Sequence, residues 1–253
     1  GKYDDALVLL DRLDADGAVA DHWWRGDDAP ADRAFTTNGV MALQIMQDGR
    51  LFAGLWAGGL MEVAADGAVV SRSRPLQHEA TSLAGVNVRA LLLARNGTLW
   101  IGHEGGLSIL DPLRNRSAWI GPAAEGQPGV DASGVSSLHR DGDMLYVGTG
   151  RGGVDRVDLA TGAVTVAQHD PGRRDSLPSN AIWDMADTGD GRLMLATSGG
   201  LGRLSRASLR AERLATSPIL PSDDVVTVTR ARDGGYWLAA WAGGVVRVRG
   251  EVN

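Results

Sequence analysis

The stretch NGTLWIGHEGGL, residues 96–107, contains the pattern that decides the fold of this 253-residue chain. It consists of a turn, a short apolar segment typical of a β-strand, and a second turn at a pair of glycines. The same pattern occurs five times, and the second glycine of each pair stands at positions 59, 106, 153, 200 and 244. Successive copies are therefore 47, 47, 47 and 44 residues apart. A fixed period of this size predicts a repeat architecture in which every copy forms the same small unit.

Each copy contains four segments with strand-like patterns, called strands a to d below. In the fourth copy we expect strands at residues 181–186, 192–197 and 201–204, and a more variable strand d near 212–215. A unit of about 45 residues with four strands has the size of one β-propeller blade. The sequence therefore predicts an all-β fold, a β-propeller of four-stranded antiparallel blades with five repeats of ~47 residues. We expect one domain over residues 1–253, with blades at 36–73, 85–120, 133–168, 179–216 and 223–253.

Neither end of the chain carries a whole repeat. Residues 1–24 contain two strand-like segments, 7–14 and 17–24, which read as strands c and d of a partial blade, whereas residues 223–253 supply only strands a to c. An unpaired edge strand exposes backbone hydrogen-bonding groups. We therefore expect the segment 18–24 to pair as strand d of the last repeat and to close a five-bladed propeller. Because strand c would then be supplied twice, the alternative is that the chain forms part of a larger propeller.

Composition excludes several classes of protein. The net charge of −6, with both signs mixed, argues against nucleic-acid binding, which needs a clustered basic surface. The chain has no cysteine, and its five histidines lack the spacing of a metal site, so we expect no disulfide, metal or cofactor. No apolar run approaches the roughly 18 residues that span a bilayer, and no signal peptide is visible. Any membrane attachment is expected to lie in segments outside this chain.

One large side chain recurs at the same place in strand b of every repeat. Its members are Phe52, Trp100, Tyr146, Met194 and Trp237. A bulky flat side chain once per blade suits the wedge between adjacent twisted sheets, and we expect these residues to form the core between blades. The alternative is that they are stacking platforms for a ligand.

The fourth repeat also carries motifs of a known family. It contains HDP at 169–171, SLPSNAI at 176–182, DGRL at 190–193 and GGL at 199–201, in that order. This segment resembles the two-component regulator propeller repeat, and the resemblance covers about residues 36–249. The sequence departs from the family at Met194, where an aromatic residue is usual, and at residues 239–240, where Ala-Ala replaces Gly-Thr.

The resemblance implies a sensory and not an enzymatic role. In that family, such blades form the extracytoplasmic part of membrane-spanning sensors with a histidine kinase or diguanylate cyclase output, and many of these sensors detect oligosaccharides or other nutrients. It therefore implies a periplasmic or otherwise extracytoplasmic domain that takes part in signal transduction. Fold alone does not establish this function.

The candidate ligand site lies at the turns between strands b and c. In a propeller these turns lie on one face around the central channel, so their side chains are expected to converge. Aromatic planes beside polar and charged groups suit an oligosaccharide or a small polar metabolite. The candidate residues are Trp56, His103, Glu104, Arg151, Thr197, Ser198 and Trp241. The alternative is that they are ordinary turn residues of a scaffold.

A second set of polar residues recurs just before strand a. Asn, Asp and Ser at such places usually form hydrogen bonds with the local backbone, so we expect this set to fix turns. Its members are Asn38, Asn87, Ser133, Asn180 and Asp223.

Two other functional hypotheses remain open at this point. The adjacent pair His103 and Glu104 could act as a general base and its partner in an enzyme similar to the streptogramin lyases, whose blades are similar. However, neighbouring residues tend to point apart, and we assign no catalytic residue. The third hypothesis is a protein-interaction platform, with a second copy in a homodimer as one such partner.

Overall fold

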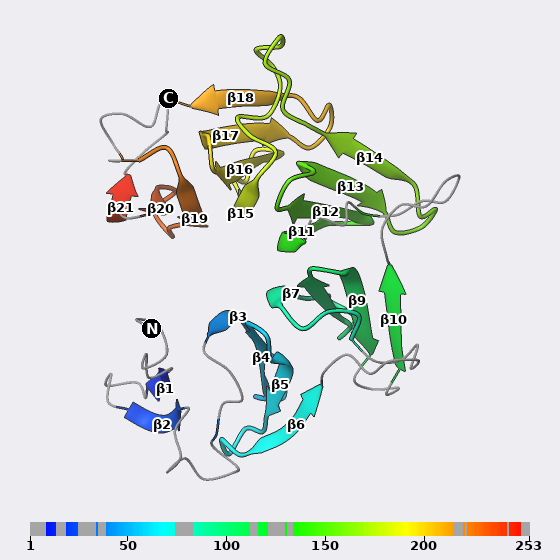
Figure 1. The fold of residues 1–253 in the computed structure, drawn as a ribbon, viewed down its shortest axis with the longest axis vertical. Helices are drawn as coiled ribbons and strands as arrows, with labels where there is room; N and C mark the ends of the chain where they lie inside the picture. Colours follow the sequence, from blue (N-terminus) through cyan, green and yellow to red (C-terminus); the bar gives the residue numbers. More distant parts are fainter. Residues whose placement is uncertain are drawn as a thin grey trace. The chain divides into compact units, whose positions relative to one another are not determined.

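The computed structural model shows a chain built from short antiparallel strands (Figure 1). The residues that it describes are 9–13, 19–24, 34, 39–73, 83–111, 116–120, 130, 134–214, 220, 222–241 and 243–248. Every regular element in these ranges is a β-strand. The chain divides into two compact units, Gly1–Trp119 and Ile120–Asn253, and each is described by itself. The single domain expected from the repeat stays a prediction.

The first unit contains two four-stranded sheets and a strand pair. The pair is β1 (Leu9–Leu13) with β2 (Val19–Trp24), and the strands are antiparallel. One four-stranded sheet consists of β3 (Val40–Ile45), β4 (Leu51–Leu55), β5 (Gly59–Val63) and β6 (Val69–Ser73). The other consists of β7 (Val88–Leu93), β8 (Leu99–His103), β9 (Gly106–Asp111) and β10 (Arg116–Ile120).

The second unit repeats this plan with two four-stranded sheets and one three-stranded sheet. The first consists of β11 (Val135–Asp141), β12 (Met144–Thr149), β13 (Val154–Asp158) and β14 (Val164–Ala167). The next consists of β15 (Ile182–Asp187), β16 (Arg192–Thr197), β17 (Gly200–Ser205) and β18 (Ala211–Leu214). The last consists of β19 (Val225–Arg230), β20 (Tyr236–Ala240) and β21 (Gly244–Val248).

These sheets confirm the predicted fold class, an all-β propeller of antiparallel blades. Within each sheet the strands are hydrogen-bonded in chain order, so strands a to d of a repeat form one blade. The expected strand bounds in the fourth repeat agree with β15 to β18 within one residue. The expected closure of the ring by residues 18–24 stays a prediction, because these residues and the last repeat belong to different units. Among the described strands, β2 pairs with β1, and the last sheet ends at β21.

Neighbouring blades within a unit pack through strand a. In the first unit β7 contacts both β3 and β4, and in the second unit β15 contacts β11 and β12 while β19 contacts β15 and β16. Strand a of one blade therefore lies against strands a and b of the preceding blade. This explains why strand b is buried over almost its whole length, since both of its faces are covered.

The recurrent large side chain of strand b fills this interface. Phe52 clusters with Val88 and Leu99 of the next blade, and Tyr146 clusters with Ile182 and Leu193 of its own next blade. The side chains at four of the five positions are buried, with exposed fractions between 1% and 8%: Phe52, Trp100, Tyr146 and Met194. The prediction of a core between blades is confirmed for Phe52, Tyr146 and Met194, which cluster with residues of the next blade. Burial excludes a stacking role for all four.

Trp237 differs from the other members of this set. Its side chain is 44% exposed, and β20, which carries it, lies in the last described sheet. The Arg247 guanidinium lies 5.3 Å from the centroid of the Trp237 ring. A cation of its own sheet therefore lies over this ring.

The glycine in strand b has a steric cause. A Cβ added at Gly54 would lie 2.6 Å from Cγ1 of Val88, and one added at Gly148 would lie 2.9 Å from Cγ2 of Ile182. Both contacts are with strand a of the next blade. A side chain at this place would push the two sheets apart, so glycine permits their close approach.

Asp184 links three blades of the second unit. Its Oδ2 accepts hydrogen bonds from Thr227 Oγ1 at 2.7 Å and from the Val228 backbone N–H at 3.0 Å, both on β19. Its Oδ1 accepts a bond from Met185 N–H at 2.8 Å and a longer one from Ser137 Oγ on β11 at 3.3 Å. The carboxylate therefore satisfies a backbone donor in the next blade and contacts a hydroxyl of the preceding one.

We predict that Asp184→Ala lowers the free energy of unfolding by about 3 kcal/mol, because it leaves the buried Val228 N–H without its acceptor and removes charge-assisted bonds. Urea unfolding followed by circular dichroism measures this loss. The control is Asp143→Ala at an exposed position of the same unit, which should change stability by less than about 0.5 kcal/mol. Equal losses in the two variants would contradict a linking role for Asp184.

Candidate functional site

The turn between strands b and c, called the b–c turn, is held in the same way in four blades. The backbone N–H of its first residue donates to a carbonyl located just before strand a of the same blade. The bonds are Trp56 to Gly39 (2.9 Å), Gly150 to Gly134 (2.9 Å), Ser198 to Ala181 (3.2 Å) and Trp241 to Asp224 (2.8 Å). This recurrent bond fixes the backbone that displays the candidate side chains.

The residue just before each b–c turn is buried. The members of this position are Leu55, His103, Thr149, Thr197 and Ala240, with exposed fractions from 0% to 6%. Thr197 Oγ1 donates to Gly200 O at 2.7 Å and accepts from Gly199 N–H at 3.1 Å. Thr149 Oγ1 does the same with Gly153 O and Gly152 N–H. The threonine hydroxyl therefore caps its own turn.

His103 takes the place of this threonine in the second blade. Its Nδ1 accepts a bond from Gly105 N–H at 3.0 Å, and its Nε2 lies 2.9 Å from Ser108 Oγ. Because Nδ1 is an acceptor, the ring is the neutral tautomer that carries its proton on Nε2. Burial lowers the pKa of His103 from 6.5 to about 4, and the nearby Glu104 carboxylate opposes this shift. His103 is a neutral turn cap at neutral pH.

The carboxylate of Glu104 is also hydrogen-bonded to the backbone. Its two carboxylate oxygens accept bonds from Val86 N–H at 2.8 Å and Asn87 N–H at 2.7 Å, in the segment before β7. Both His103 nitrogens and both Glu104 oxygens therefore have internal partners. The hypothesis of a lyase that uses this pair as general base and partner loses its structural support, because neither group is presented to solvent as a free acid or base.

The exposed candidates are those that follow the buried position. Trp56 is 46% exposed and Trp241 is 70% exposed, and the Arg89 guanidinium lies 5.0 Å from the Trp56 ring centroid. Arg151 and Ser198 are exposed as well, and Ser198 Oγ lies 2.8 Å from Ser179 Oγ. Trp56, His103 and Glu104 belong to the first unit and the other four candidates to the second. Ligand binding by these residues stays a prediction.

The polar residues before strand a fix turns where the structure describes their bonds. Asn87 Oδ1 accepts a bond from Ala57 N–H at 2.7 Å, and Asn180 Oδ1 accepts one from His169 N–H at 2.6 Å. The structural role is confirmed for these two residues, but the expectation of local bonds was wrong, because the donors lie 30 and 11 positions away in the sequence. Asn38 and Ser133 lie outside the described residues, and the role of the Asp223 side chain stays a prediction.

The described part of the chain contains no group of three or more histidine, aspartate or glutamate side chains that could hold a metal ion. Nor does this part include a helix of the length and apolarity needed to cross a membrane.

Part of the second repeat is similar to a known family. A sequence model of a family described as "Two component regulator propeller" matches residues 82–105. Residues 82–105 are therefore similar to a two-component regulator propeller repeat. The matched segment runs from just before β7 to the first b–c glycine, so it includes the two residues His103 and Glu104 that fix this turn. The resemblance noted in the sequence is confirmed. No curated protein matches the chain.

Two solved structures share the fold of these propeller repeats. One is the extracellular domain of the putative hybrid two-component system BT3049 from B. thetaiotaomicron, with a TM-score of 0.69 and 19% identity over 81% of this chain and 28% of that one. The other is the extracellular domain of the putative one-component system BT4673 from the same organism, with a TM-score of 0.65 and 18% identity over 90% of this chain and 29% of that one. The chain thus spans less than a third of either structure. At this level of identity these likenesses show the fold alone.

We predict that His103→Thr flattens the dependence of stability on pH between 6.5 and 4. The folded state binds fewer protons than the unfolded state in this range because the pKa of His103 is lowered to about 4. Its contribution to stability is therefore fully present above pH 6.5 and is lost as the pH falls toward 4, by roughly 3 kcal/mol in total. Threonine retains a turn-capping hydroxyl and does not titrate.

The measurement is urea unfolding of both proteins at pH 7, 5.5 and 4. The difference in stability between wild type and His103→Thr should change steadily in favour of the variant as the pH falls. An identical pH dependence in the two proteins would contradict the burial and neutrality of this histidine.

Proposed function

We propose that this chain is the ligand-sensing, extracytoplasmic propeller region of a bacterial signalling receptor. Two findings support the proposal: the two-component regulator propeller repeat at 82–105, and the titles of the two fold neighbours, both extracellular domains of signalling systems. The proposal includes a membrane-spanning segment and a histidine kinase or diguanylate cyclase output, encoded in the same gene outside this chain.

We further propose that the b–c turns bind a small polar ligand, most simply a saccharide. The proposal rests on two exposed tryptophan side chains whose backbone is fixed by hydrogen bonds. Trp56 and Trp241 stand at the same place in their turns, each N–H is bonded to the segment before strand a, and both rings are exposed. An indole plane held in this way can stack on the apolar face of a sugar at low cost in ordering.

In each unit, polar groups on or near the b–c turns add hydrogen-bonding capacity. Arg151 and Ser198 are exposed on b–c turns of the second unit, and Arg89 lies over the Trp56 ring in the first. His103, Thr197 and Glu104 act indirectly in this proposal, because they hold the turns that carry the exposed groups.

The test is calorimetry with a panel of neutral and acidic oligosaccharides. A bound glycan should lose at least about tenfold in affinity in Trp56→Ala or Trp241→Ala, which corresponds to about 1.4 kcal/mol, because stacking area is removed. The matched control is Trp237→Ala, which removes an equally exposed indole from a strand and not from a turn. Unchanged affinity in the double variant of Trp56 and Trp241 would remove the site assignment.

A further inference from the structure

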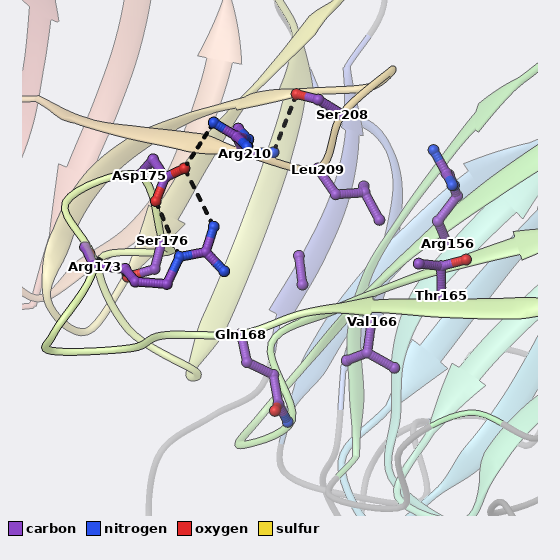
Figure 2. A pocket seen from close by; sticks show the side chains of 11 residues that line it. Arg156, Thr165, Val166, Gln168, Arg173, Asp175, Ser176, Ser208, Leu209 and Arg210 are labelled. Carbon is purple, nitrogen blue, oxygen red and sulfur yellow. Dashed lines mark hydrogen bonds and ion pairs between the residues drawn. The ribbon is translucent and has the colours of Figure 1, made fainter.

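A groove in the second unit has no b–c turn residue in its lining, although Gln168 of that lining donates to Gly152 O at 3.3 Å. It is formed by β14, by the segment that follows this strand, and by the turn that connects β17 with β18 (Figure 2). Its volume is about 260 Å³. Pockets for whole drug-sized ligands start near 300 Å³, so the groove has the size for one functional group or one small molecule.

The groove is basic although the chain is acidic. Its charged lining residues are Arg156, Arg173, Arg210 and Asp175, a formal excess of two positive charges, whereas the whole chain carries −6. The side chains of Arg173 and Arg210 are 57% and 70% exposed. A cluster of arginines concentrated in one concavity attracts anions more strongly than the same charges spread over a surface.

Most arginine donors at the groove are not used by the protein's own carboxylate. Arg173 Nε and Nη2 donate to the two Asp175 oxygens at 3.1 and 3.2 Å, and Arg210 Nη1 lies 3.3 Å from Asp175 Oδ2. Figure 2 shows Asp175 between the two guanidinium groups. A guanidinium has five N–H donors in a planar fork, so a single aspartate leaves the majority of them available to a second acceptor.

The walls of the groove are preorganised. Ser176 Oγ donates to Asp170 O at 2.8 Å or to Arg173 O at 2.9 Å, and it accepts a bond from Asp170 N–H at 3.0 Å. On the facing side, Arg156 Nη1 donates to the carbonyls of residues 206 and 207 at 3.1 and 3.2 Å. The loop that carries Arg173 and the side chain of Arg156 are therefore fixed before any ligand arrives, which reduces the entropic cost of binding.

We propose that this groove binds the oxyanion group, a carboxylate or a sulfate, of a small ligand. Arginine forks recognise both groups through paired N–H···O bonds. Asp175 acts as an internal competitor in this arrangement, because it holds Arg173 and Arg210 in place and also neutralises part of their charge. The site consists of residues of the second unit alone, and it does not rest on ligand binding at the b–c turns.

The test is isothermal titration at low ionic strength with three probes: inorganic sulfate, glucuronate and, as a neutral sugar, glucose. Wild type should bind at least one of the anions and not glucose, and added sodium chloride should weaken the binding. The double variant Arg173→Gln with Arg210→Gln should lose at least about tenfold in affinity. Asp175→Asn should instead gain affinity, about threefold or more, since it removes the competing charge.

The control is Arg192→Gln, which removes an arginine of similar exposure from β16 and should leave the affinity unchanged. Thermal unfolding of each variant shows that the fold is retained. A stronger response to sulfate assigns a tetrahedral group, and a stronger response to glucuronate assigns a carboxylate. The proposal is overturned if wild type binds neither anion, if glucose binds as well as they do, or if all variants bind alike.

Discussion

The structure depends on the backbone of the second glycine in each b–c pair. All five of these glycines have a positive φ, from 71° to 119°: Gly59, Gly106, Gly153, Gly200 and Gly244. In this region of conformational space only glycine is free of strain. The N–H of Gly59 donates to Val86 O and that of Gly153 to Asn180 O, each in the segment that leads into the next blade. The same turn therefore reverses the chain within one blade and joins that blade to its neighbour within a unit.

This dual role explains why so much of the fold could be predicted from the sequence. Each repeat needs a glycine at the turn that both reverses its chain and contacts the next repeat. The glycines therefore recur at a fixed spacing, and the period can be seen in a single sequence. The large side chain of strand b was predictable for the same reason, because each blade needs one bulky residue between it and the next blade. Tyr146 and Met194 are both buried at this position. The closure expected from residues 18–24 depends on edge strands outside the repeating pattern; within its own unit β2 pairs with β1.

The candidate site was only partly predictable. Alternation along a strand normally separates inward from outward side chains, but β8 is buried at every position, so the pattern gives no sign that His103 is inside. Leu55 at the equivalent place in the first repeat was the available signal, because an apolar residue there indicates burial. The arginine groove left no signal in the repeat. Apart from Arg156 on β13, its residues come from β14, a connecting loop and the turn before β18, which are the variable parts of two successive blades.

The central claim is that Gly153, the second glycine of its pair, is required for close approach and not only for its φ angle, and comparison with Gly162 separates the two effects. Both have a positive φ, 89° and 74°, but a Cβ at Gly153 would lie 2.1 Å from Ala167 O, whereas one at Gly162 would meet nothing within 4 Å. At Gly244, in the last described sheet, an added Cβ would meet nothing within 4 Å, so there only the φ angle requires glycine. The most direct measurement is the free energy of unfolding of Gly153→Ala and Gly162→Ala in urea. We expect a loss of about 1 kcal/mol for Gly162→Ala from φ strain alone, and of about 3 kcal/mol or more for Gly153→Ala. Equal losses would contradict the claim, because they would show that backbone conformation alone accounts for the glycine.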